Sequence, residues 1–109
     1  MALFVSQAVP RFSSTTTTST VGISESRAEI TVPSGATSVH ISTAEDTAAN
    51  LPIYIGPDDT DNTGIQIGSK SGTQPYSNVY VELAPNAALW GNNDSTRATT
   101  NVNFVWFYD

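Results

Sequence analysis

The chain has 109 residues, a length that suits one domain and is too short for two. Ten acidic and four basic residues give a formal net charge of −6, and the four cations are scattered singly along the sequence. Nucleic acids and anionic membranes are bound through clustered basic residues, so the composition argues against both as partners. The absence of cysteine excludes disulfides and thiolate metal sites.

Targeting signals are not predicted. The opening MALFVSQAVPRF lacks the basic n-region and the sustained apolar run of a secretory signal peptide. No stretch approaches the length of a membrane span. We therefore expect a protein made in the cytoplasm, or one released without a cleaved signal.

Residues 1–20 are predicted to form an extended N-terminal arm, or a first strand plus a Thr-rich linker, ahead of a β-sandwich domain at 21–109. An apolar opening precedes the tract SSTTTTST, which ends at Thr20. This tract is either an exposed edge strand or a flexible tether, because threonine runs form no core of their own. An apolar segment on a polar tether is suited to reaching a neighbouring subunit.

Clear alternation of apolar and polar residues begins at Arg27. In RAEITV the Ala, Ile and Val side chains point to one face, and PSGA at 33–36 supplies a turn. TSVHIST resumes the period, with Val39 and Ile41 pointing inward and His40 outward. The two segments together predict a β-hairpin.

Further short strands are expected in LPIYIG, GIQIG and YSNVYVEL, and APNAALWG turns through Pro85 and Asn86 into a strand that ends at Trp90. The polar segment GNNDSTRATTN is expected to be a loop.

The last segment, VNFVWFY, is apolar on both faces. Phe104, Trp106 and Tyr108 share one face with Val102, and the remaining apolar residues form the other. Such a strand is either central in a sandwich or packed against another subunit. Short strands separated by turn signals, without a helical period, predict an all-β fold: a single-domain antiparallel β-sandwich or a barrel-like fold.

Catalytic chemistry is not predicted, and neither is a cofactor. His40 is the only histidine and stands on the polar face of its segment. The sequence contains no nucleophile elbow, phosphate-binding loop or zinc-protease motif. We expect a protein that is not an enzyme and that acts through its surfaces.

Asp58, Asp59 and Asp61 form the most concentrated acidic cluster. DTDNTG at 59–64 imitates the first half of an EF-hand loop, but the twelfth position, where a bidentate Glu belongs, is Lys70. An EF-hand is therefore rejected. A weak Ca²⁺ site completed by loop carbonyls and a solvated turn are the two remaining interpretations.

Three aromatic residues, Tyr76, Tyr80 and Trp90, suggest a sugar-stacking platform. Their alternative role is to fill the core or an interface, which is the more common use of such side chains.

Part of the sequence resembles a known family. IYIGPDDTDNTGIQIG, then VYVELAPNAALWG, then a terminal aromatic strand are similar to a pattern in small structural proteins of tailed bacteriophages. The matching positions are Ile53 to Gly56, Gly64 to Ile67, Val79 to Pro85, and Leu89 to Trp90. Asn86 departs from the pattern, because a Gly often follows the Pro. The matching residues are packing and turn residues, so they bear on the fold more firmly than on function.

The resemblance is to head decoration (cement) proteins, and it implies a virion protein on the outer surface of the capsid. Such a protein bridges neighbouring subunits of the major capsid protein and stabilises the shell. A homo-oligomer, either a trimer or a dimer, is expected with it. The alternative is a tail- or fibre-associated module that recognises a host-surface carbohydrate. The apolar opening and the last strand supply the predicted interface residues, namely Leu3, Phe4, Val5, Phe12, Phe104, Trp106 and Tyr108.

Overall fold

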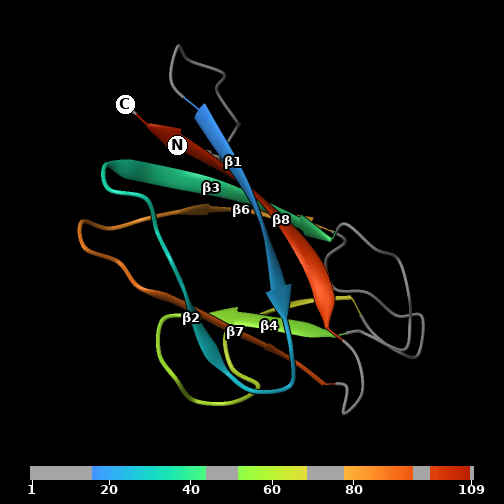
Figure 1. Ribbon diagram of the computed structural model, residues 1–109. Coiled ribbons are helices and arrows are strands. Elements are labelled where there is room, and N and C mark those ends of the chain that lie inside the picture. The colour runs from blue at the N-terminus through green and yellow to red at the C-terminus, as the bar shows by residue number, and fades with distance from the viewer. Residues whose placement is uncertain (1–15, 44–51, 69–77, 95–98, 109) are drawn as a thin grey trace, which may run out of the picture.

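The structure, a computed structural model, describes residues 16–43, 52–68, 78–94 and 99–108, and the regular elements in them are all strands. The strands are β1 (Thr16–Ile23), β2 (Ala28–Ile30), β3 (Ala36–Thr43), β4 (Ile53–Gly56), β5 (Ile65–Ile67), β6 (Asn78–Glu82), β7 (Leu89–Asn93) and β8 (Thr100–Tyr108). They form two antiparallel four-stranded sheets, sheet A in the order β1-β8-β3-β6 and sheet B in the order β2-β7-β4-β5. Figure 1 shows the two sheets as two layers. The predicted all-β, sandwich-like fold is confirmed.

The core lies between the two sheets and follows from the alternation of side chains along each strand. Its buried residues come from both layers: Ile23, Ile30, Val39, Ile41, Ile53, Ile55, Ile67, Leu89, Val102, Phe104 and Trp106. The rings of Phe104 and Trp106 stack, with centroids 5.4 Å apart and an angle of 8° between their planes. The Trp106 indole Nε1 donates a hydrogen bond to Ser19 Oγ at 3.0 Å, which satisfies the polar atom of the largest core side chain.

Strand β8 is apolar on both faces because it is a central strand. It lies between β1 and β3, and its inward residues form the middle of the core. On the outer side Phe107 is only 4% exposed, and its ring makes a T-shaped contact with the Tyr80 ring, with centroids 5.8 Å apart. Of the two predictions for this segment, a central strand or a strand packed against another subunit, the structure shows the central strand.

The described part of the Thr-rich tract is an edge strand. Strand β1 pairs with β8 without a break in register, from Thr16 opposite Phe107 to Ile23 opposite Thr100. Residues 16–20, which the sequence assigned to the arm or linker, thus belong to sheet A. The rest of the predicted arm, residues 1–15, lies outside the described residues.

The predicted hairpin between RAEITV and TSVHIST is wrong. The turn forms, with Gly35 at a φ of 88° and the Ala36 amide donating to the Pro33 carbonyl at 3.2 Å. However, β2 pairs with β7 in sheet B, and β3 pairs with β6 and β8 in sheet A. The turn therefore carries the chain from one layer to the other. The apolar faces of β2 and β3 then face each other across the core between the two sheets.

Strand β7 runs to Asn93, beyond its predicted end at Trp90. Asn93 is 1% exposed, and its side-chain amide donates to the Ile23 carbonyl at 2.7 Å and to Thr100 Oγ1 at 3.3 Å. Buried polar groups are tolerated where they are hydrogen-bonded. Both partners lie outside the local sequence. The GNN segment, which was expected to begin a loop, therefore completes strand β7.

Candidate functional site

Arg27 fixes the loop between β4 and β5 to sheet B. Its guanidinium contacts five oxygen atoms. Nε and Nη2 donate to the Asp58 carbonyl at 3.1 and 3.0 Å. Nη1 donates to Asn92 Oδ1 at 2.9 Å and to the carbonyls of Tyr54 and Thr63 at 3.2 and 3.3 Å. Nη2 also reaches Thr63 Oγ1 at 3.3 Å. The planar fork of arginine suits such a set of fixed acceptors.

The loop conformation itself is held by local bonds. Asp58 Oδ1 accepts the Thr60 amide at 3.1 Å, and Asn62, at a φ of 56°, bonds through its amide to Asn92 Oδ1 at 3.1 Å. Gly64 has a φ of 100°, and a β-carbon there would collide with the carbonyl oxygen of Ile55. The loop is therefore a fixed turn that presents its acidic side chains outward.

This arrangement gives no support to the calcium candidate at Asp58, Asp59 and Asp61. All three are exposed, and among the described residues no group of three or more His, Cys, Asp and Glu is placed to hold a metal ion. The Asp58 and Thr63 carbonyls of this loop accept hydrogen bonds from Arg27.

The outer face of sheet A is nearly free of charge. Its strands present hydroxyl, amide and aromatic side chains, among them Thr18 and Thr20 on β1 and Tyr80 on β6. In the part of this face that the structure describes, Glu82 at the end of β6 is the one carboxylate, and the half-buried His40 lies near the middle of the sheet.

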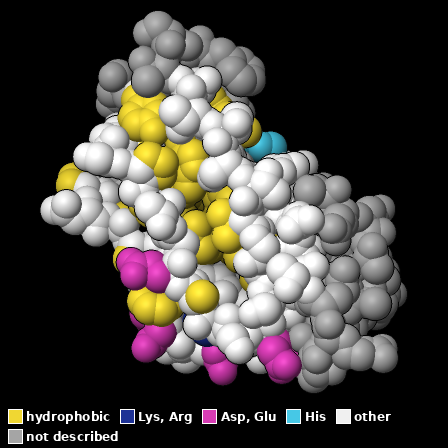
Figure 2. Space-filling view, in the orientation of Figure 1, with side chains coloured by type: hydrophobic (Ala, Val, Ile, Leu, Met, Phe, Trp, Pro, Cys, Tyr) yellow, Lys and Arg dark blue, Asp and Glu magenta, His cyan; other side chains and the backbone are white. Residues whose placement is uncertain are grey.

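Sheet B and its adjoining loops carry the acidic residues. Of the seven carboxylates in the described ranges, six lie on β2, in the loops before β2 and between β4 and β5, or directly after β7: Glu25, Glu29, Asp58, Asp59, Asp61 and Asp94. In Figure 2 the acidic side chains gather at the sheet B end, and none covers β1. The described part of the molecule thus has a neutral face and an acidic face.

Two grooves lie at the edges of the sandwich, where the two sheets meet. One, of about 320 Å³, lies between the edge strands β1 and β2 and is lined by Val21, Ile30, Pro33 and Trp106 among others. The second, of about 250 Å³, lies at the opposite edge, where Ile55, Ile65 and Leu83 contribute to its lining. Both are shallow and lack the convergent titratable groups of a catalytic cleft.

The structure separates the predicted interface residues. Phe104 and Trp106, at 0% and 1% exposed, are core residues and offer no surface to a partner. Tyr108 is half-buried, and its hydroxyl shares a hydrogen bond of 3.0 Å with Thr17 Oγ1. The other four predicted residues, Leu3, Phe4, Val5 and Phe12, lie outside the described residues.

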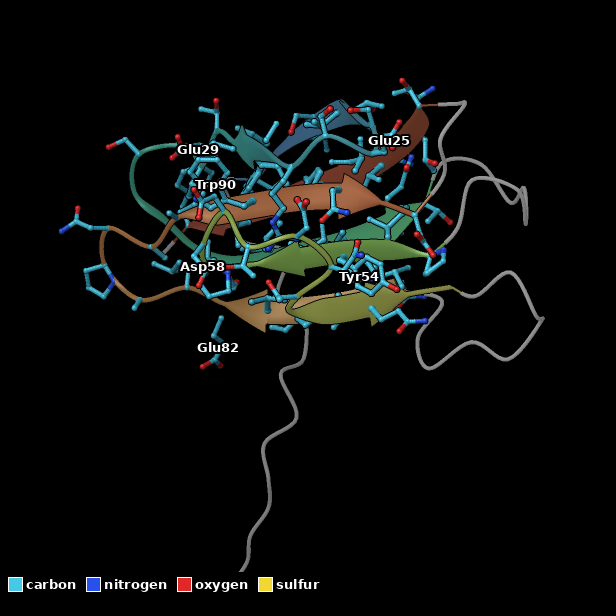
Figure 3. The ribbon with its side chains drawn as sticks, turned by 90° about the horizontal axis from the view of Figure 1, so that it is seen from below. Glu25, Glu29, Tyr54, Asp58, Glu82 and Trp90 are labelled. Atoms are coloured by element: carbon cyan, nitrogen blue, oxygen red, sulfur yellow. The ribbon has the colours of Figure 1, made fainter. Side chains whose placement is uncertain are left out.

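The predicted aromatic platform is also divided. Tyr80 lies on the outer face of sheet A, where its hydroxyl meets Ser38 Oγ at 2.7 Å. Trp90 lies on the outer face of sheet B, and Tyr76 lies outside the described residues. A residue that the sequence did not single out, Tyr54, shares the face of Trp90, because it pairs with Asn92, two residues along β7 from Trp90. Figure 3, seen from the sheet B side, shows Glu29 next to Trp90, its cross-strand partner.

In the described ranges there is no helix of the length and hydrophobicity that a membrane span requires. Comparison of the chain with protein-family models, with curated proteins and with solved structures finds no match.

Proposed function

We propose that this chain is a structural virion protein that decorates a bacteriophage capsid and stabilises it by bridging subunits of the major capsid protein. The outer face of sheet A is the docking surface, and sheet B faces solvent. The observation that carries this orientation is the unequal distribution of charge between the two faces. The identity of the docking target rests on the resemblance of residues 53–90 to head decoration proteins.

A neutral, aromatic-containing face suits a protein contact. The central parts of interfaces are depleted in charge and enriched in aromatic residues. Sheet A supplies the half-buried Tyr80 and Val105 within a surround of threonine and asparagine. An acidic outer side keeps decorated particles apart in solution, because like-charged surfaces repel.

The test introduces the same charge on each face. His40→Glu places a carboxylate in the middle of the sheet A face, and Gln66→Glu places one on the sheet B face. Both positions are half-buried. The His40 ring bonds to Asn78 Oδ1 at 3.4 Å, and the Gln66 amide donates to the Gly68 carbonyl at 3.1 Å. The two variants are therefore matched in burial, and each substitution removes a single side-chain hydrogen bond.

Each full-length variant is mixed with phage shells assembled without the protein, and bound protein is measured by sedimentation. We expect His40→Glu to weaken binding by at least tenfold and Gln66→Glu to leave it within about twofold, since a buried polar group without a partner costs about 1–3 kcal/mol and a charged group costs more. Equal weakening in both variants, or no binding by the unmodified chain, contradicts the proposal.

A second function, carbohydrate binding, is favoured by one observation: Trp90 and Tyr54 lie on adjacent strands of the outer face of sheet B, with Glu29 opposite Trp90. Exposed aromatic rings stack on sugar faces, and a carboxylate accepts hydroxyl hydrogen bonds. Glycan arrays probed with the unmodified chain and with Trp90→Ala test this function, and Tyr80→Ala on the opposite face is the control. Binding that survives Trp90→Ala, or no binding at all, removes it.

A further inference from the structure

The edge of strand β1 differs from the other three sheet edges. Strand β1 has eight residues, whereas β2, β5 and β6 have three, three and five. Its sequence, TTTSTVGI, contains no charged residue and no proline, and it runs along β8 without a bulge. In the part of the chain that the structure describes, no strand pairs with its other side.

Long edge strands without charge, proline or bulge are uncommon in proteins that remain monomeric. Sheet edges are normally protected from pairing by charges, prolines, bulges or short length, because their unpaired backbone groups accept another strand. The edge strand β2 carries Glu29, and β6 ends in Glu82. Strand β1, from Thr16 to Thr20, has none of these protections and is exposed along these five residues.

The groove beneath this edge is open, and its accessible apolar side chains are the half-buried Val21 and Pro33. Threonine and serine side chains line much of the rest, and Glu29 is the one charged residue that borders it. Figure 2 shows hydrophobic side chains exposed beside β1. A strand added to β1 would cover part of this groove, so pairing would bury apolar surface as well as satisfy backbone groups.

We propose that β1 is a self-association edge, at which a second copy of this chain pairs its own β1 in antiparallel orientation. The two four-stranded A sheets would then continue as one sheet of eight strands. Side chains on the same face meet across such a pair. Thr16, Thr18 and Thr20 of one copy would therefore meet the same three residues of the other.

The charge distribution favours a second copy over an unrelated acidic or basic partner. A chain of net charge −6 repels its own copies, but six of the seven described carboxylates belong to sheet B and its loops. Threonine opposite threonine meets no repulsion and gains hydroxyl and methyl contacts that suit a pleated surface. The neutral edge is thus the place where two acidic molecules can approach.

The test is the solution mass of the purified full chain, measured by sedimentation equilibrium without shells or other partners. A strand-edge contact is small, so we expect the mass to rise from 11.6 kDa towards twice that value between about 1 μM and about 1 mM. Thr18→Lys should weaken association by at least tenfold. Asn78→Lys, an exposed position on the opposite edge of the same sheet, should leave it within about twofold.

A rescue experiment separates edge pairing from local damage. Thr18→Lys and Thr18→Glu should each stay monomeric, whereas an equal mixture should recover dimers, because the introduced charges then face their opposites. A wild-type chain that stays monomeric throughout the range overturns the proposal. Loss of association in Asn78→Lys but not in Thr18→Lys also overturns it. The proposed docking on shells is a separate measurement, so either idea can fail alone.

Discussion

Among individual residues, Arg27 connects separate segments of the chain through hydrogen bonds from its guanidinium. It bonds to β4, to β7 and to the loop between β4 and β5, and one of its acceptors, Asn92 Oδ1, belongs to a side chain only 2% exposed. The remaining partner of that oxygen is the Asn62 amide. Removing the guanidinium therefore leaves Asn92 Oδ1 with one donor and takes a donor from the part-buried carbonyls of Tyr54 and Thr63, which costs more than the loss of an exposed hydrogen bond.

We expect Arg27→Ala to lower the free energy of unfolding by about 2–4 kcal/mol, measured by chemical denaturation. Arg27→Lys should recover less than half of that loss, because an ammonium group keeps the charge but cannot reach five fixed oxygens at once. Ser26→Ala, an exposed neighbour, is the control and should change stability by less than about 0.5 kcal/mol. Full recovery by lysine would show that charge, rather than the fork geometry, holds the loop.

At the scale of elements, the turn between β6 and β7 has a conformation that only a few residues adopt. The Ala87 amide donates to the Ala84 carbonyl at 3.0 Å, and Asn86 has a φ of 63°. Pro85 followed by a residue at positive φ is typical of a type II turn. Asparagine tolerates this backbone better than other residues with a β-carbon, so it suits this position of the turn.

Asn86→Ala should therefore destabilise the protein by about 1 kcal/mol, while Asn86→Gly should be neutral or slightly stabilising. Thermal unfolding of the two variants beside the unmodified chain gives the comparison. An alanine variant as stable as the glycine variant would mean that the turn relaxes to negative φ at no cost.

Strands could be predicted from the sequence where alternation is strong, and pairing could not. The period in RAEITV and TSVHIST correctly placed Ile30, Val39 and Ile41 inside, but alternation does not say which sheet a strand joins. A short turn between two strands suggests a hairpin, yet here it connects layers. The extension of β7 through Asn92 and Asn93 could not be predicted for a related reason: the hydrogen-bond partners of these side chains come from segments distant in sequence.

The candidate surfaces were less predictable than the strands. Phe104 and Trp106 are conspicuous in the sequence and lie in the core, whereas the neutral face of sheet A is made of unremarkable Thr, Ser and Asn residues. Segregation of charge between faces depends on which strands share a sheet. Net charge and composition alone carry no such information.

At the scale of the whole molecule, the separation of the two faces predicts how docking responds to salt. Packed sheets lie about 10 Å apart, and the Debye length is about 8 Å at an ionic strength of 0.15 M. Above that ionic strength the acidic side chains on sheet B and its loops are screened from a surface that contacts the outer face of sheet A. Shell binding through sheet A should therefore change by less than about threefold between about 0.15 M and about 1 M NaCl.

The His40→Glu variant is the matched comparison, because a carboxylate placed in the contact should make its residual binding depend on salt. A tenfold or larger change in the unmodified chain would mean that charged groups lie within the contact, which would contradict docking through the neutral centre of the sheet A face.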